Sequence, residues 1–230
     1  MFIPLRDTTF RLRTPYVTIG IIVLNGLVYC YQLTIPRQLI NEWFYSTGVV
    51  ANVLFQRGIT GLFVPFFTAL FVHVNFLHLA GNMLYLWIFG DNIEGILGHV
   101  KFLMFYLLCG ILATLCQIVL NFQANLPIIG ASGAISGVLG AYLVRYPRAR
   151  IQVFLWIFFI IRRVWVPALY VLGFWFLIQL SNGLGALTIR QQGGVAWFAH
   201  IGGFLAGVVL LLALEPYERK RMWKQLNQNS

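Results

Sequence analysis

Long apolar runs separated by short polar connections dominate the chain, and this pattern predicts membrane-spanning helices. A helix needs about 20 mostly apolar residues to cross the hydrocarbon core of a bilayer. Six segments fit: Tyr16 to Leu33, Phe76 to Leu97, Phe102 to Leu120, a fourth from "GASG" (130–133) to Arg145, Val164 to Leu180, and Gly194 to Leu214. We therefore expect one domain over residues 1–230, with a six-helix core at 16–214 and polar tails at 1–15 and 215–230.

Two further apolar stretches are too short to be counted as spans. "ITGLFVPFFTALFV" (59–72) lies in the long connection after the first span and is interrupted by a proline. "IQVFLWIFFI" (151–160) is bounded by Arg150 and Arg162, and its length suits an interfacial segment better than a crossing. The expected fold class is all-α, a polytopic membrane protein built as a six-transmembrane-helix bundle with a short, submerged fourth helix.

The composition supports a membrane protein. Of the 230 residues, 60% are hydrophobic and 10% are charged, against roughly 45–50% and 25% in soluble domains. The net charge of +10 is spread over short basic runs between apolar segments, so we expect no nucleic-acid partner. Cys30, Cys109 and Cys116 lie inside apolar runs without CxxC spacing, and HExxH is absent. The sequence thus predicts neither a metal nor a cofactor.

The distribution of basic residues predicts the orientation in the membrane. With the N-terminus inside, thirteen Lys and Arg residues are cytoplasmic and only Arg37, Arg57 and Arg190 lie outside. Since short cytoplasmic loops carry the excess of Lys and Arg, both termini are expected in the cytoplasm. The long first connection and the loop from Ser181 to Gly194 are then extracytoplasmic. That loop contains four glycines and is a candidate mobile lid.

Three clusters of polar residues interrupt the apolar segments. They are "HVNFLHLAGN" (73–82), "GASGAISG" (130–137) and "WFAHIGGFLAG" (197–207). Polar groups at membrane depth are costly and call for a partner or a purpose. By the orientation above, all three clusters lie toward the extracytoplasmic leaflet. We therefore expect them to form one site.

Helical spacing predicts which of these residues share a face. His78 and Asn82 are four apart and lie on one face. Small residues at GxxxG-like spacing let two helices approach closely, so the fourth and sixth spans are expected to pack together and to carry His200 toward a serine. The small residues concerned are Gly133, Gly137 and the row Ser132, Ser136 and Gly140 in the fourth span, and Gly203 and Gly207 in the sixth.

The length of the fourth helix indicates which serine is reactive. Residues 131–146 span only about 24 Å as a helix, against a hydrocarbon core of about 30 Å. Its start is then submerged, where non-helical backbone needs protein or water around it. Ser132 lies at this start, and its N–H is free to face an oxyanion at the positive end of the helix dipole. Ser136 lies one turn deeper with its N–H committed, so Ser132 is the predicted nucleophile.

These motifs together resemble the rhomboid family of intramembrane serine proteases. "GASG", "AHIGGFLAG", "HVNFLHLAGN" and "FGDNIE" carry the resemblance, which extends from "PLRD" near the start to the sixth span. It implies Ser132 as nucleophile, His200 as general base, and His78 and Asn82 with the Ser132 amide as oxyanion donors. It also implies His73 as a structural or water-organising histidine and Glu94 as a link between loops. Apart from the resemblance, we expect supporting roles for Gly130, Gly133, Ser136, Gly203 and Gly207.

The chain departs from the family pattern at two places. Many members carry an aromatic residue four positions after the nucleophile, against the catalytic imidazole, whereas this chain has Ser136. We hypothesise that a hydrogen bond from Ser136 orients His200 instead. The Trp-Arg pair of the family's first loop is also missing, with Val64 and Pro65 at the expected place.

The predicted activity is hydrolysis of peptide bonds in or near transmembrane segments by a Ser-His dyad. The expected partners are transmembrane substrates in a lipid bilayer, by resemblance in a prokaryotic plasma membrane, and the sequence does not predict an oligomeric state. Trp175 and Gln179 share a face of the fifth span and line either a substrate route or an ordinary packing surface. Two alternatives stay open: a non-catalytic rhomboid-like protein that binds membrane clients, and a channel for protons or ammonium built on the histidines.

Overall fold

The computed structural model describes residues 2–56, 58–121, 125–157, 160–189 and 194–215. Some features of the sequence analysis therefore lie wholly or partly outside the described residues: Arg57, Arg190, part of the loop from Ser181 to Gly194, and the basic tail after residue 215. The helices are α1 (Tyr16–Gln32), α2 (Ile40–Thr47), α3 (Gly58–Thr68), α4 (Phe76–Leu97), α5 (His99–Leu120), α6 (Ser132–Arg145), α7 (Ala168–Ile189) and α8 (Trp197–Leu214), with 3₁₀ turns at Ala51–Gln56 and Ala69–Phe71. The strands are β1 (Phe2–Asp7), β2 (Arg150–Ile157) and β3 (Ile160–Pro167).

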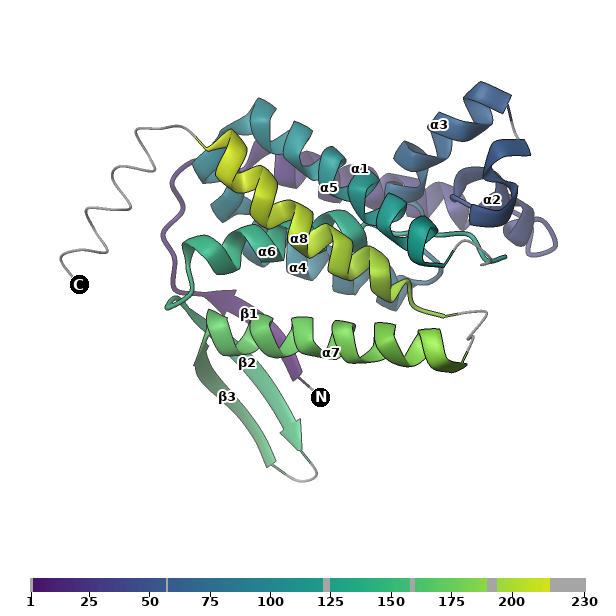
Figure 1. Cartoon of the computed structure of the whole chain (residues 1–230). Coiled ribbons are helices and arrows are strands. Elements are labelled where there is room, and N and C mark those ends of the chain that lie inside the picture. Colours follow the sequence, from purple (N-terminus) through teal and green to yellow (C-terminus); the bar gives the residue numbers. More distant parts are fainter. Residues whose placement is uncertain (1, 57, 122–124, 158–159, 190–193, 216–230) are drawn as a thin grey trace.

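The protein is mostly helical, but the expectation of an all-α fold is wrong. The three strands form one antiparallel sheet in the order β1-β2-β3, and β2 and β3 extend below α7 in Figure 1. The stretch expected as an interfacial segment contributes β2 and enters a hairpin with β3. The physical reason is the alternation of its side chains, because Ile151 and Val153 are buried while Arg150 is exposed and Gln152 is partly exposed.

The fifth predicted span is also displaced. Val164 to Pro167 complete β3, so α7 begins only at Ala168. The helix then continues to Ile189, which makes most of the candidate lid from Ser181 the last turns of α7. The other five predicted spans correspond to α1, α4, α5, α6 and α8 within a few residues.

Length and hydropathy identify three described helices that can cross a membrane by themselves. They are His99–Leu120, Ala168–Leu187 and Trp197–Leu214. A fourth arises if the pair Phe63–Phe71 and Phe76–Leu97, bent by 89°, is one broken span. The chain is thus an integral membrane protein with several crossings. The count of six remains a prediction, since α1 and α6 have only 17 and 14 residues.

Helix α6 occupies the centre of the bundle, between α4, α5 and α8 (Figure 1). All its residues from 133 to 142 are buried. A Cβ built on Gly207 or Gly203 of α8 would collide with the backbone carbonyl of Gly137 or Gly133 of α6. The predicted packing of these helices through small residues is confirmed.

Near the C-terminal end of α4, the side chain of Glu94 links α4 to α1 and α5. Its carboxylate accepts hydrogen bonds from the Val17 and Thr18 amides at 2.9 and 2.8 Å and from the Thr18 hydroxyl at 2.7 Å, and it contacts His99 Nδ1 at 2.6 Å. The residue before α1 is a proline, whose side chain makes no capping hydrogen bond. Glu94 therefore caps α1 from a neighbouring helix, satisfying amides that the first turn leaves without partners.

Glu94→Ala is expected to lower the free energy of unfolding by about 3 kcal/mol, since it removes a cap and leaves buried donors unsatisfied. Reversible unfolding in detergent measures the change. Glu42→Ala is the matched control, because Glu42 is exposed on α2 and its loss should cost less than about 0.5 kcal/mol. Equal stabilities of the two variants would contradict the capping role.

Candidate active site

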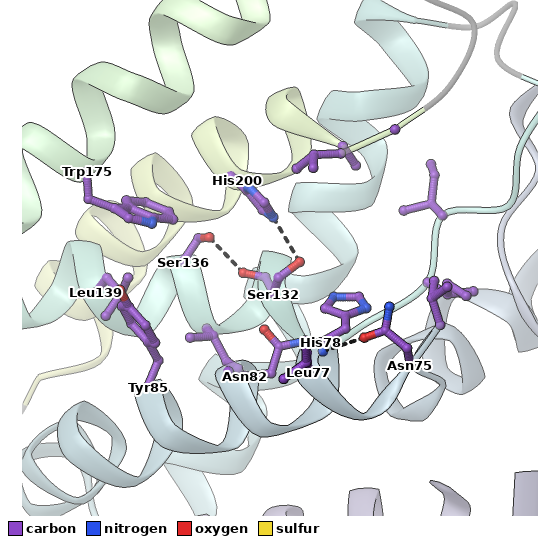
Figure 2. A pocket seen from close by; sticks show the side chains of 18 of the residues that line it. Asn75, Leu77, His78, Asn82, Tyr85, Ser132, Ser136, Leu139, Trp175 and His200 are labelled. Atoms are coloured by element: carbon purple, nitrogen blue, oxygen red, sulfur yellow. Dashed lines mark hydrogen bonds between the residues drawn. The ribbon is translucent and has the colours of Figure 1, made fainter. Parts of the chain in front are cut away.

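Ser132 and His200 meet where α6 and α8 begin. His200 Nε2 lies 2.9 Å from Ser132 Oγ, a hydrogen-bonding distance (Figure 2). The side chains come from residues 68 apart in the chain. The glycine contacts described above bring the two backbones close enough for a short serine and an imidazole to touch.

The second ring nitrogen of His200 faces α7. Its Nδ1 lies 2.8 Å from Gln179 Oε1, and the ring of Trp175 lies 5.9 Å from the imidazole at 38°. The hypothesis that Ser136 orients His200 is wrong. Ser136 Oγ donates at 2.7 Å to the carbonyl of Ser132, because a helical serine has the carbonyl four residues earlier within reach.

The contact between Gln179 and His200 is not predicted by the sequence. The spacing of Gln179 in the sequence predicts only the lining of a substrate route or a packing surface, whereas its side chain contacts the imidazole. A signal was present in the sequence, since an amide at membrane depth in an apolar helix requires a partner. The spacing within α7 could not show that this partner belongs to α8.

His78 borders the start of α6. Gly130 has a φ of +113°, and a Cβ at this position would lie 2.7 and 2.9 Å from His78 Cε1 and Nε2. Only glycine suits both the backbone conformation and this close approach. Asn82 Nδ2 lies 3.7 Å from the same Cβ position. Both predicted oxyanion donors therefore lie beside the segment that leads into Ser132.

His73 and Asn75 support these donors. Asn82 Nδ2 donates to His73 Nε2 at 2.9 Å, and Gln32 donates to the His73 carbonyl at 2.7 Å. Asn75 caps α4 by accepting the His78 amide at 2.9 Å. Because an amide nitrogen carries two protons, Asn82 retains one donor while His73 holds its orientation.

The N-terminal turn of α6 also supplies backbone hydrogen-bond donors. The first hydrogen bond of this helix runs from Ile135 N to Ala131 O at 3.0 Å. The amides of Ser132, Gly133 and Ala134 therefore precede the regular ladder, and N–H groups of a first turn can bind an anion. The Ser132 amide adjoins its own hydroxyl, so an anion bound there would lie next to the serine oxygen.

A cavity of about 560 Å³ opens onto these groups. Its lining combines residues of α4, α6, α7 and α8 with the segments before α6 and α8, and it includes Ser132, His200, His78, Asn82 and Trp175 (Figure 2). Ser132 is therefore not enclosed by apolar side chains on every side. Both water and an extended peptide segment have space beside it.

Comparison with known proteins identifies the family of this chain. A family model of the Rhomboid domain matches residues 60–216. The chain belongs to the rhomboid family.

Individual rhomboid relatives differ from this chain in sequence and in length. It is 27% identical over 214 residues to "Presenilin-associated rhomboid-like protein, mitochondrial" of Mus musculus, covering 89% of this chain and 49% of that protein. It is 31% identical over 160 residues to "Rhomboid protein 1, mitochondrial" of Saccharomyces cerevisiae, covering 66% and 43%. It is 29% identical over 226 residues to "Rhomboid protease AarA" of Providencia stuartii, covering 89% and 74%.

The chain spans about half the length of the mitochondrial relatives. The relatives come from both mitochondria and a bacterium, so the comparisons do not favour the predicted prokaryotic plasma membrane over an organellar membrane.

Proposed function

We propose that this rhomboid is an intramembrane serine endopeptidase that hydrolyses peptide bonds in or near transmembrane segments. The contact of 2.9 Å between His200 Nε2 and Ser132 Oγ carries the proposal. A hydroxyl and an imidazole from separate helices meet beside a cavity, which is the arrangement that nucleophilic catalysis requires. The printed name of one relative, "Rhomboid protease AarA", also supports it.

In the acylation step, His200 Nε2 accepts the proton of Ser132 Oγ while that oxygen attacks the peptide carbonyl. The resulting imidazolium then donates this proton to the leaving amine, and the peptide bond breaks. The product is an ester between Ser132 and the N-terminal fragment. In deacylation, His200 takes a proton from a water molecule while the water oxygen attacks the ester carbonyl. The imidazolium then returns this proton to Ser132 Oγ as the ester bond breaks, and the N-terminal fragment leaves with a carboxylic acid at its new end.

The tetrahedral intermediates carry a negative charge on the former carbonyl oxygen. His78, the second amide proton of Asn82 and the Ser132 N–H are the proposed donors to it. Their places beside Gly130 and the mouth of α6 support these roles. A donor of this kind typically contributes about 10²–10³ in rate. The proposed supporting roles of Gly130, Gly133, Gly203 and Gly207 are to permit these close approaches.

A substrate helix hides its peptide bonds in its own hydrogen bonds, so it must unwind locally to reach Ser132. We therefore propose substrates with small or helix-breaking residues near the cleavage site. The excess of basic residues in the segments predicted to be cytoplasmic supports cytoplasmic termini and a site open to the extracytoplasmic side. One domain of six spans, with a cytoplasmic N-terminus at residues 1–15 that contributes β1 and a cytoplasmic tail at residues 215–230, completes this proposal.

Labelling with a fluorophosphonate tests the function directly, because such probes react with an activated serine. We expect stoichiometric modification at Ser132, measured by intact mass and peptide mapping. His200→Ala should slow labelling at least about 10²-fold, since the base is removed. Ser136→Ala serves as control and should still be labelled. Labelling that is independent of His200 would contradict the mechanism. The absence of any labelling, with clients still bound, would favour the non-catalytic alternative.

A further inference from the structure

We infer that Gln179 of α7 is a positioning residue that orients His200 through its side-chain oxygen, which makes the dyad an uncharged triad of Ser132, His200 and Gln179. This inference rests on the proposed function. Its basis is one continuous chain of contacts, from Gln179 Oε1 to His200 Nδ1 at 2.8 Å and from His200 Nε2 to Ser132 Oγ at 2.9 Å.

The hydrogen bonds around Gln179 determine which tautomer of His200 is present. The Gln179 amide nitrogen donates to the carbonyl of Trp175 at 3.4 Å. The reversed amide would place two oxygens against each other at that point, so the oxygen is the atom that faces His200. An amide oxygen only accepts, so His200 Nδ1 must carry the proton. The lone pair of Nε2 then points at the Ser132 hydroxyl, as a general base requires.

The burial of Gln179 indicates that its side chain faces His200 and not the lipid. Gln179 is 5% exposed, whereas its neighbours Leu177 and Ile178 are 60% and 39% exposed on the outer face of the same helix. An amide inside a membrane helix is costly without partners. The partners of Gln179 are the imidazole and the carbonyl one turn earlier.

Trp175 completes the contact of α7 with the base. It lies one turn before Gln179 and packs its ring beside the imidazole. Many rhomboids have an aromatic residue at the position of Ser136 that packs against the catalytic imidazole, and in this chain Trp175 makes that aromatic contact from α7. His200 is carried by α8 but is held in orientation by α7. The two contacts remove the rotational freedom that a lone imidazole would have around its side-chain bonds.

The chemistry of the third member also suits its surroundings. In soluble serine hydrolases an aspartate or glutamate holds the tautomer and stabilises the imidazolium. A carboxylate at membrane depth carries a large desolvation cost. An amide oxygen holds the same tautomer without a net charge, at the expense of weaker stabilisation of the imidazolium.

Three substitutions at residue 179 separate orientation from packing. Gln179→Leu keeps the volume but removes the acceptor, and Gln179→Asn keeps the amide but shortens its reach. Both should lower kcat about 10–100-fold with KM changed less than about threefold, because the tautomer is no longer held. Gln179→Glu restores an acceptor oxygen at the same distance and should retain activity within about tenfold of wild type.

Thermal unfolding of the same variants distinguishes this role from a structural one. A buried carboxyl group should lower the stability of Gln179→Glu at least as much as Gln179→Leu is lowered. If Gln179→Glu is less stable but still active, its activity comes from the restored hydrogen bond to His200 and not from better packing. The inference is overturned if Gln179→Leu cleaves within twofold of wild type, or if folded Gln179→Glu is as inactive as Gln179→Leu.

Gln117 offers a matched control that does not depend on folding of the Glu variant. Its side chain is buried, and its oxygen accepts the Ala199 amide at 3.1 Å, one residue before His200, whereas the two ring nitrogens of His200 pair with Gln179 and Ser132. Gln117→Leu should lower stability but change kcat less than about threefold. Equal losses of kcat in Gln117→Leu and Gln179→Leu would show a structural effect and overturn the inference. Failure of the wild type to cleave or to be labelled would instead refute the proposed function.

Discussion

Replacing Ser132 with alanine is expected to lower the cleavage of a reconstituted transmembrane substrate at least about 10⁴-fold. The nucleophile is lost, and the acyl-enzyme cannot form. Removing a member of a serine-histidine catalytic unit eliminates nearly all of its contribution, and the residual rate reflects the oxyanion donors alone. Cleavage in proteoliposomes, followed by the appearance of both fragments, measures the effect. Thermal unfolding should show that the variant still folds, because Ser132 is only half-buried.

Ser136→Ala is the matched control for this experiment. Its hydroxyl lies one turn deeper and donates to the Ser132 carbonyl, so its removal deletes one hydrogen bond within the helix and leaves the contact with His200 in place. We expect turnover within about tenfold of wild type. Full activity of Ser132→Ala, or an equal loss in both variants, would refute the assignment of the nucleophile.

Gly207→Ala is expected to have the largest effect on stability. The added Cβ would collide with the backbone of Gly137, and backbone in the middle of a buried helix cannot move aside as a flexible side chain can. Helices α6 and α8 must separate, at a cost of about 3 kcal/mol or more. Since the same approach brings His200 to Ser132, we also expect cleavage to fall at least about 10²-fold. Unfolding in detergent and fluorophosphonate labelling measure the two effects.

Gly173→Ala is the control for the glycine substitution. Gly173 lies inside α7, and a Cβ there meets no atom within 4 Å. Alanine favours a helix over glycine by up to about 1 kcal/mol, so this variant should be as stable as wild type or more stable. If Gly207→Ala were as stable and active as Gly173→Ala, close packing of α6 and α8 would not be what assembles the site.

The hydrophobic pattern predicted α1, α4, α6 and α8 closely, because each is an apolar run with a clear boundary in polar residues, proline or glycine. It failed where periodicity was ambiguous. A short run of β-branched and aromatic residues such as 151–160 suits either a membrane interface or a strand. Pairing with β3 in a hairpin, and with β1, whose residues Phe2 and Asp7 pair with Leu155 and Ile151, makes this run a strand.

For the candidate site too, the sequence predicted some features and not others. The clusters of polar residues at one depth identified Ser132, His200, His78 and Asn82 as neighbours, and the structure places them around one cavity. Their catalytic roles stay a proposal. What holds His200 could not be predicted, because the choice between Ser136 and Gln179 depends on side-chain directions across three helices.

The sequence by itself determined the membrane environment, the family and the helices that carry the polar residues, since these follow from composition, local periodicity and short motifs. Only the tertiary structure decided the sheet, the extent of α7 and the partner of the imidazole. The physical reason is range. Apolar burial and helical spacing act between residues a few positions apart, whereas a hydrogen bond between α7 and α8 or a strand pairing exists only once distant segments have packed.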